Sequence, residues 1–550
     1  MQGKSYLMAG VAVVALVASS DAGLAKTKHH TAAAAPAATS DATPAPAASN
    51  GPTNAELADR LSALEAELAA DHEKRDSDHN RLSALEQNFN VTSWSFDNSR
   101  PTVKSGDGRF TLSFRARFQF DSAMFMQDSP TSPTNFAQFK DLASGSVVRR
   151  AYFGIEGKAF SDFWYEFRLN GGGSDGGSAG ASGVPTGGEG DLLVNIARVQ
   201  YNGIPNFRIN VGIIEPIQSL DGSISSGQLI FLERAEIENI AADSFGGGDS
   251  RRGIEATFQK TDIFMPGDNL VISGAYTGNK TGSNVGHGNF GDEQTQAIGR
   301  VAYRIWSDGV SNIQIGGSGG AALYSGANNT STPGAVLGLR FRDRPEIRID
   351  GTRLIDTGGI NAKTGDYYGF DAAGNIENFY LGGEYMNFTA DRMATSTQVA
   401  DSPNFSGWFV EGTWVLTGET RQYSPSAMNN EYGAFNAPRV ANPFSLSGNS
   451  WGAWELAVRY SDTNLNWRDS FAGTPKVGLV LGSQAGIAGG DERIIALGIN
   501  WYLNQNIRIM LDDNIVTVKK LSSAGANPLV PANQIGQSFN ELGARVQFQM

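Results

Sequence analysis

Residues 112–121 read LSFRARFQFD, and the alternation in this stretch decides the fold class. Side chains of a β-strand point in turn to its two faces, so every second residue shares a face. About ten alternating residues are typical of a strand in a membrane-spanning barrel, whose apolar face contacts lipid and whose polar face points inward. The apolar face here is Leu112, Phe114, Ala116, Phe118 and Phe120, and the polar face is Ser113, Arg115, Arg117, Gln119 and Asp121.

The same alternation recurs at residues 454–460 and in the last ten residues, 541–550. A soluble β-sandwich alternates as well, because its inner face is apolar. Three features favour the barrel: an export-type N-terminus, long strands over some 450 residues without a break, and an alternating terminal strand. No apolar run approaches the ~20 residues of a membrane-spanning helix, so any membrane crossing must use strands.

Counting strands tests this topology, because a barrel whose two ends lie on one side needs an even number. We expect an all-β, antiparallel transmembrane barrel of sixteen strands, with eighteen as the alternative. The weakest of the eighteen candidates are 345–353 and 366–373. The candidates are 109–121, 146–158, 162–170, 192–202, 206–214, 250–260, 268–277, 294–306, 311–320, 334–343, 345–353, 366–373, 376–389, 405–417, 450–461, 491–503, 506–518 and 539–550.

Composition excludes several classes of function. Only 18% of the 550 residues are charged, fewer than the ~25% of ordinary domains, and the net charge of -13 gives no basis for nucleic-acid binding. Cysteine is absent, which excludes disulfides and thiolate chemistry. Four of the five histidines precede the barrel region, which leaves His287 alone. A histidine-based catalytic triad or metal site is therefore not expected, and neither is an enzyme or a cofactor.

The N-terminal part divides into three segments before the barrel region at 92–550. Residues 1–25 form a predicted signal peptide, with Lys4, an apolar run over residues 7–17, and small residues at 23–25 for cleavage. Residues 26–52 are rich in Ala and Pro without periodicity, which is typical of an extended linker.

Residues 53–91 carry a heptad pattern. The six residues RLSALE at 60–65 recur at 81–86, three heptads later, so the apolar seam stays in register. This predicts an oligomer-forming coiled coil in the periplasm, and the alternative is a single amphipathic helix on a surface. Whether it contacts the cell wall is left open. The seam is Leu57, Leu61, Leu64, Leu68, Leu82, Leu85 and Phe89.

Several motifs along residues 92–550 resemble the phosphate-selective porin O and P family. They are Phe96-Asp97-Asn98, RRAYFG at 149–154, FLERA at 231–235, WVLTGE at 414–419, AWELA at 453–457 and GINWYLN at 498–504. The resemblance implies a sixteen-stranded barrel, a homotrimer, loops folded into the lumen, and passive uptake of small anions, phosphate in the name-giving members. One departure is the last residue, Met550, where such barrels usually end in Phe or Trp.

The polar strand faces predict which residues line a pore, because a pore selects by size and by lining charge. By this facing, 14 basic and 8 acidic residues point inward, and arginine predominates, which suits contact with oxyanions. The alternative is a salt-bridged wall without strong selectivity. The predicted pore-lining residues of the anion pathway are Arg115, Arg117, Arg150, Lys158, Arg168, Arg198, Arg208, Arg251, Arg300, Arg340 and Arg459.

The connection 215–249 is too long for a simple hairpin and contains the apolar stretch LIFLERA. We expect it to fold inward and narrow the channel through Phe231, Glu233 and Arg234. The alternative is an ordinary extracellular loop.

Together these features predict an outer-membrane porin for passive diffusion of small hydrophilic solutes, with a preference for anions such as phosphate. Its expected partners are outer-membrane lipid, two further copies, and the barrel-assembly machinery, which reads the C-terminal strand. The alternative function is structural, a barrel whose coiled coil tethers or spaces the membrane from the cell wall.

Overall fold

The computed structural model describes residues 53–90, 93–96, 99–127, 141–173, 192–246, 250–280, 292–327, 336–394, 400–426, 432–468, 486–521 and 534–550. The predicted signal peptide at 1–25 and linker at 26–52 lie outside these described residues. By its internal contacts the chain divides into residues 1–79 and residues 80–550.

Helix α1 (Asn54–Asn90) occupies the predicted coiled-coil segment. Its start is a capping box, in which the Glu56 amide donates to Thr53 Oγ1 and the Thr53 amide donates to Glu56 Oε2. The leucines of the predicted seam, from Leu57 to Leu85, are 49–66% exposed in the single chain. The side chain of Phe89, the last seam position, lies outside the described residues. No helix in the described part of the chain is long and apolar enough to cross a membrane.

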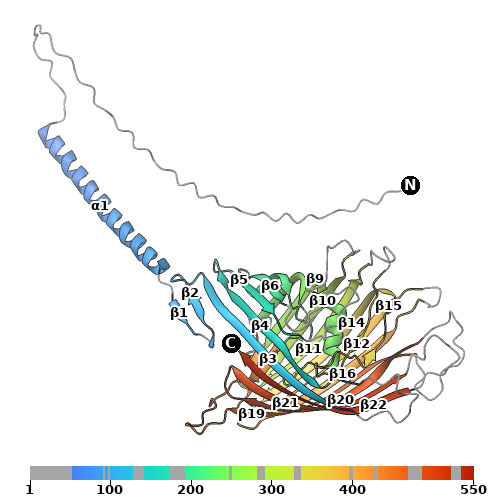
Figure 1. The fold of residues 1–550 in the computed structure, drawn as a ribbon. Helices are drawn as coiled ribbons and strands as arrows, with labels where there is room; N and C mark the ends of the chain where they lie inside the picture. Colours follow the sequence, from blue (N-terminus) through green and yellow to red (C-terminus); the bar gives the residue numbers. More distant parts are fainter. Residues whose placement is uncertain are drawn as a thin grey trace, which may run out of the picture. The chain divides into compact units, whose positions relative to one another are not determined.

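Sixteen antiparallel strands form one closed barrel, as predicted (Figure 1). The last strand pairs with the first barrel strand from Gln549 opposite Arg117 to Phe539 opposite Gln127, which closes the wall. Two short extra strands, β1 (Ser93–Ser95) and β2 (Thr102–Lys104), extend the sheet beside the first barrel strand. The barrel strands are β3 (Thr111–Gln127), β4 (Gly145–Ala159), β5 (Phe163–Asn170), β6 (Leu193–Tyr201), β7 (Phe207–Ile214), β8 (Arg251–Thr261), β9 (Asn269–Lys280), β10 (Thr295–Ser307), β11 (Asn312–Tyr324), β14 (Ala362–Ile376), β15 (Phe379–Arg392), β16 (Asn404–Val415), β19 (Ala453–Trp467), β20 (Ile487–Tyr502), β21 (Ile507–Leu521) and β22 (Gln534–Gln549).

The strands predicted at 334–343 and 345–353 are wrong, and their removal reduces eighteen to sixteen. Between β11 and β14 the described chain has only β12 (Arg342–Asp343) and β13 (Ile355–Asp356), which pair with each other. The alternating Leu339 and Phe341 are buried in an apolar cluster that includes residues of α2 (Glu236–Phe245). Alternation indicates an extended segment with one buried face. Here the extended segment is part of a loop inside the barrel and not a strand of the wall. The other weak candidate, 366–373, lies within β14.

The outer face of the wall is apolar. On β3, Phe118 and Phe120 are exposed, while Gln119 and Asp121, which alternate with them, are buried on the inner side. Stacked or tilted aromatic pairs sit on this outer face at the strand ends beside the short turns, the position of an aromatic girdle at a membrane interface. These pairs are Phe163 with Tyr201, Phe207 with Phe258, Phe379 with Trp414, and Trp454 with Trp501.

Three long connections pack against the inner side of the wall: 215–250, 325–361 and 416–452. The first carries α2, which contacts β10, β11, β14, β15, β16 and β19. Phe245 of α2 stacks on Phe341 of the second connection and on Phe388 of the wall. The third carries the small hairpin of β17 (Arg421–Ser424) and β18 (Ala434–Pro438). It joins β16 to β19 at the end that otherwise carries short turns.

Candidate functional site: the arginine-lined interior

The structure places ten of the eleven predicted pore-lining residues on barrel strands with their side chains on the inner side of the wall. Most of them are covered by the packed connections and are not open to water. Arg117, Lys158 and Arg208 remain partly exposed. The covered residues are Arg115, Arg150, Arg168, Arg198, Arg251, Arg300 and Arg459.

Arg340 does not lie on a barrel strand, in contrast to the prediction. It belongs to the connection 325–361 and forms an ion pair with Asp356 of the same connection. The error has the same cause as the two false strands, because the segment that contains Arg340 alternates as part of a loop.

Glu233 of the connection 215–250 is the centre of a buried cluster of arginines. Its carboxylate accepts from Arg149 at 2.7 and 3.0 Å and from Arg545 at 2.9 Å, and Arg150 lies 3.5 Å away. Arg348 of the next connection is 3.8 Å away. Burial by itself raises the pKa of Glu233, but the four guanidinium groups outweigh it and hold that pKa well below its usual range. The carboxylate is therefore ionised and joins the loop to strands β4 and β22.

Arg149 was missed by the sequence analysis because simple alternation allows only one of two consecutive residues to face inward. A β-bulge solves this: Arg150 pairs with Gln119 and Val148 pairs with Phe120, so Arg149 is the extra residue of β4. Both guanidinium groups consequently reach Glu233. A bulge adds one residue to one strand and re-aims its side chains, and an RR pair in a predicted strand is the signal that would have suggested it.

The barrel seam is itself held by charge. Arg545 of β22 makes a two-bond contact with Asp121 of β3, at 2.6 Å for each bond, and also donates to the Leu232 carbonyl. Such paired N–H···O bonds are among the stronger contacts in proteins. This contact links the first and last barrel strands to the inward connection.

A second ion-pair network lies on strands β3 to β6. Glu166 accepts from Arg115 at 2.9 Å and from Arg198 at 2.8 Å, with Arg168 at 3.5 Å. Arg115 also donates to Glu156 at 2.9 Å. These arginines are neutralised in place by acids on the same wall, as the salt-bridged alternative anticipated.

The other two residues predicted for the constriction are also on the inner side. The Phe231 ring is buried beneath Arg459, whose guanidinium carbon lies 4.4 Å from the ring centroid. The Arg234 guanidinium donates to the Asp221 and Ile224 carbonyls of its own loop. Phe231 and Glu233 thus face the wall, whereas Arg234 stabilises the loop through hydrogen bonds to its backbone.

A closed antiparallel barrel of sixteen strands, apolar outside and charged inside, with inward-packed connections, defines an outer-membrane porin channel rather than an enzyme. A family model described as "Phosphate-selective porin O and P" matches residues 123–550. The chain belongs to this family.

Similar proteins were found by sequence and by structure. An uncharacterized protein of Caulobacter vibrioides is 24% identical over 456 residues, which cover 81% of this chain and 75% of the relative. Among solved structures, the outer membrane channel DcaP of Acinetobacter baumannii matches with 10% identity and a TM-score of 0.40, over 81% of this chain and 99% of its own. An anion-selective porin from Comamonas acidovorans matches with 12% identity and a TM-score of 0.40, over 80% and 100%.

Proposed function

We propose that the barrel is a water-filled channel for passive diffusion of small hydrophilic solutes and that it favours anions such as phosphate. The observation that carries this proposal is a set of three lumen-side cations, Arg117, Lys158 and Arg208. Each is partly exposed, and none forms an ion pair with a described residue. All three lie near the short-turn ends of their strands.

These three charges act on a permeating ion because water reaches them. Two unit charges 4 Å apart interact by ~1 kcal/mol in water and ~4 kcal/mol at an effective dielectric of 20. Even the smaller value changes ion occupancy about fivefold. The buried arginines around Glu166 and Glu233 have the different role of holding the wall and the loop together.

The connection 215–250 is proposed to set the width of the channel. Its support is the Glu233 cluster and the contacts of α2 with six wall strands, which hold the loop across the interior.

The test is the reversal potential of the purified full-length protein in a planar bilayer under a salt gradient. A potential that reports anion preference, and that falls at high salt because of screening, is expected. Equal permeability for anions and cations in low salt would contradict the preference. The conductance measured with anions and cations of graded size would then give the width of the channel at its narrowest point.

We further propose that the chain is exported by residues 1–25, is read by the barrel-assembly machinery through β22, and forms a homotrimer whose helices α1 associate in the periplasm. The support for association is the in-register repeat of 60–65 at 81–86 and the exposed leucines of α1. The second candidate function, a structural tether, rests on the same helix. A barrel that carries no current in the bilayer experiment would favour the tether over the channel.

A further inference from the structure

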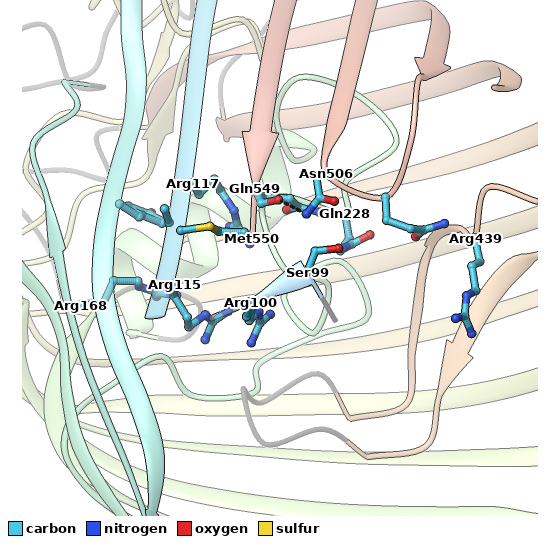
Figure 2. A pocket seen from close by; sticks show the side chains of 13 residues that line it. Ser99, Arg100, Arg115, Arg117, Arg168, Gln228, Arg439, Asn506, Gln549 and Met550 are labelled. Carbon is cyan, nitrogen blue, oxygen red and sulfur yellow. Dashed lines mark hydrogen bonds between the residues drawn. The ribbon is translucent and has the colours of Figure 1, made fainter. Parts of the chain in front are cut away.

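A pocket of about 450 Å³ opens at the short-turn end of the barrel, beside the point where β22 ends (Figure 2). Its lining comes from the segment before β2, strands β3 to β5, the connections 215–250 and 416–452, the turn between β20 and β21, and the end of β22. The volume lies within the ~300–1,000 Å³ typical of sites for small molecules.

The charge of this pocket is one-sided. Five of its thirteen lining residues are arginines, and none is Asp or Glu. Three of the arginines are held by carboxylates behind the surface: Arg100 and Arg115 by Glu156, and Arg168 by Glu215.

Arg117 and Arg439 are different. Arg117 donates to the hydroxyls of Ser226 at 2.7 Å and Ser225 at 2.9 Å, and its Nε is buried without a partner among the described residues. Arg439 is exposed and approaches from the connection 416–452, on the other side of the view in Figure 2. Neither forms an ion pair with a described residue, so two positive charges remain unneutralised.

We propose that this pocket binds a small oxyanion, a carboxylate or a phosphate, as the last site before release on the short-turn side. The planar guanidinium group presents paired donors that match the oxygens of both anions. The amides of Gln228 and Gln505 add neutral donors to the same space. A recess lined by one sign of charge also concentrates counter-ions. The proposal rests on the proposed channel function, because the solute reaches the pocket through the barrel.

The test is isothermal titration calorimetry of the detergent-purified full-length protein with citrate, with inorganic phosphate, and with glucose as an uncharged solute. We expect both oxyanions to bind and glucose not to bind. Arg117→Gln and Arg439→Gln should each weaken oxyanion binding about tenfold, and Arg439 tests the site independently because it lies on a loop and not on the wall. The control is Arg109→Gln, an exposed arginine just before β3 that does not line the pocket, and this variant should bind like the wild type.

The outcomes separate the pocket from the channel. No binding of either oxyanion, or equal weakening of binding in Arg109→Gln, overturns the pocket. Binding of phosphate without citrate supports the pocket and identifies inorganic phosphate as its occupant, whereas binding of citrate alone identifies an organic acid. If the current favours anions but both pocket variants bind oxyanions with unchanged affinity, the proposed binding site is wrong and the proposed channel function is supported. A wild type that conducts no anions but binds them at Arg117 and Arg439 contradicts the channel alone.

Discussion

At the scale of the residue, the interior separates charges that hold the protein together from charges that a solute can meet. Glu233 belongs to the first group, since Arg149, Arg150 and Arg545 surround it in the dry interior. Arg117 belongs to the second, because its side chain is partly exposed and donates to two serine hydroxyls without an ion pair among the described residues. Arginines that look equivalent in the sequence therefore differ in what their removal would do.

Glu233→Gln should loosen the connection 215–250 while the barrel stays folded. Removing one charge of a buried ion pair typically costs about 3–5 kcal/mol, because the partner charge is left unpaired. The measurement is limited trypsin cleavage after Arg234, which should become faster, beside an unheated gel that reports the folded barrel. Glu215→Gln is the control, because the Glu215 side chain in the same connection is 35% exposed. Equal cleavage of the wild type and both variants would contradict the anchoring role.

Arg117→Glu should shift the reversal potential toward cations, with a smaller shift at high salt. The reason is a reversal of charge by two units at a water-exposed position on the inner face of β3. Arg115, its neighbour on the same face, is the poorer choice because a glutamate there would meet Glu156 and Glu166.

Phe118→Glu is the matched control for this change. Phe118 is 43% exposed on the outer face, where a carboxylate is costly in lipid, so we expect reduced insertion instead. If Arg117→Glu kept the wild-type ion preference while Phe118→Glu inserted normally, the two faces of β3 would be reversed.

At the scale of the element, β22 both closes the barrel and holds the inward loop. On its outer face Phe548 pairs with Phe118 of β3 and Ile507 of β21. On its inner face Gln547 accepts from Gln119 and donates to the Gly227 carbonyl of the connection 215–250. The strand ends at Gln549, and beyond it the backbone N–H of Met550 donates to the Ala116 carbonyl next to β22's partner residues on β3.

Phe548→Ala should lower the amount of folded barrel in the outer membrane more than Gln547→Ala. Loss of a large apolar side chain from the lipid-facing surface removes up to about 2 kcal/mol of transfer free energy. The measurement is the fraction of heat-modifiable protein in outer-membrane preparations at equal expression. Equal fractions for the two variants would count against Phe548 as an assembly determinant.

Inward glycines mark where loops approach the wall. A Cβ at Gly498 of β20 would lie 3.0 Å from the Phe231 ring, and one at Gly407 of β16 would lie 2.3 Å from Ile237 of α2. The wall has glycine at these positions because side chains of the connection 215–250 occupy the space that a larger residue would need. These glycines are a feature of the packing and could not be told apart from turn glycines in the sequence alone.

At the scale of the whole molecule, the barrel has its own closed sheet and ion-pair networks, whereas α1 presents an apolar seam that is uncovered in one chain. A helix with such a seam gains stability by packing against further copies, since most helix stability in proteins comes from packing of an apolar face and not from propensity. Association of the copies is therefore expected to depend on α1. Folding of the barrel is expected to be independent of α1.

Deletion of residues 53–91 should weaken the oligomer and leave the barrel folded. The measurement is sedimentation of the purified protein, with the unheated gel as the check on folding. A point-variant comparison sharpens it: Leu64→Asp with Leu85→Asp should mimic the deletion, whereas Glu65→Gln with Glu86→Gln should not. An oligomer of unchanged stability after deletion would show that the barrel alone holds the copies together.

The fold class followed from the sequence alone, because a two-residue alternation over about ten residues has few stable solutions other than a sheet with one apolar face. The sequence also indicated the helix at 54–90 through its heptads, and the inner face of strands such as β3. These are local properties, set by the period of one strand or helix, so they can be read without knowing what each element packs against.

Two properties depend on the tertiary structure: which alternating segments belong to the wall, and which arginines remain open to water. Leu339 and Phe341 alternate in a loop that packs on α2, and Arg149 faces inward because of a bulge in β4. Arg300 and Arg117 both lie on polar strand faces. Asp371 pairs with Arg300 at 2.7 Å, whereas Arg117 donates to two serine hydroxyls and forms no ion pair with a described residue. Each of these outcomes depends on contacts between residues far apart in the chain, and local periodicity carries no information about them.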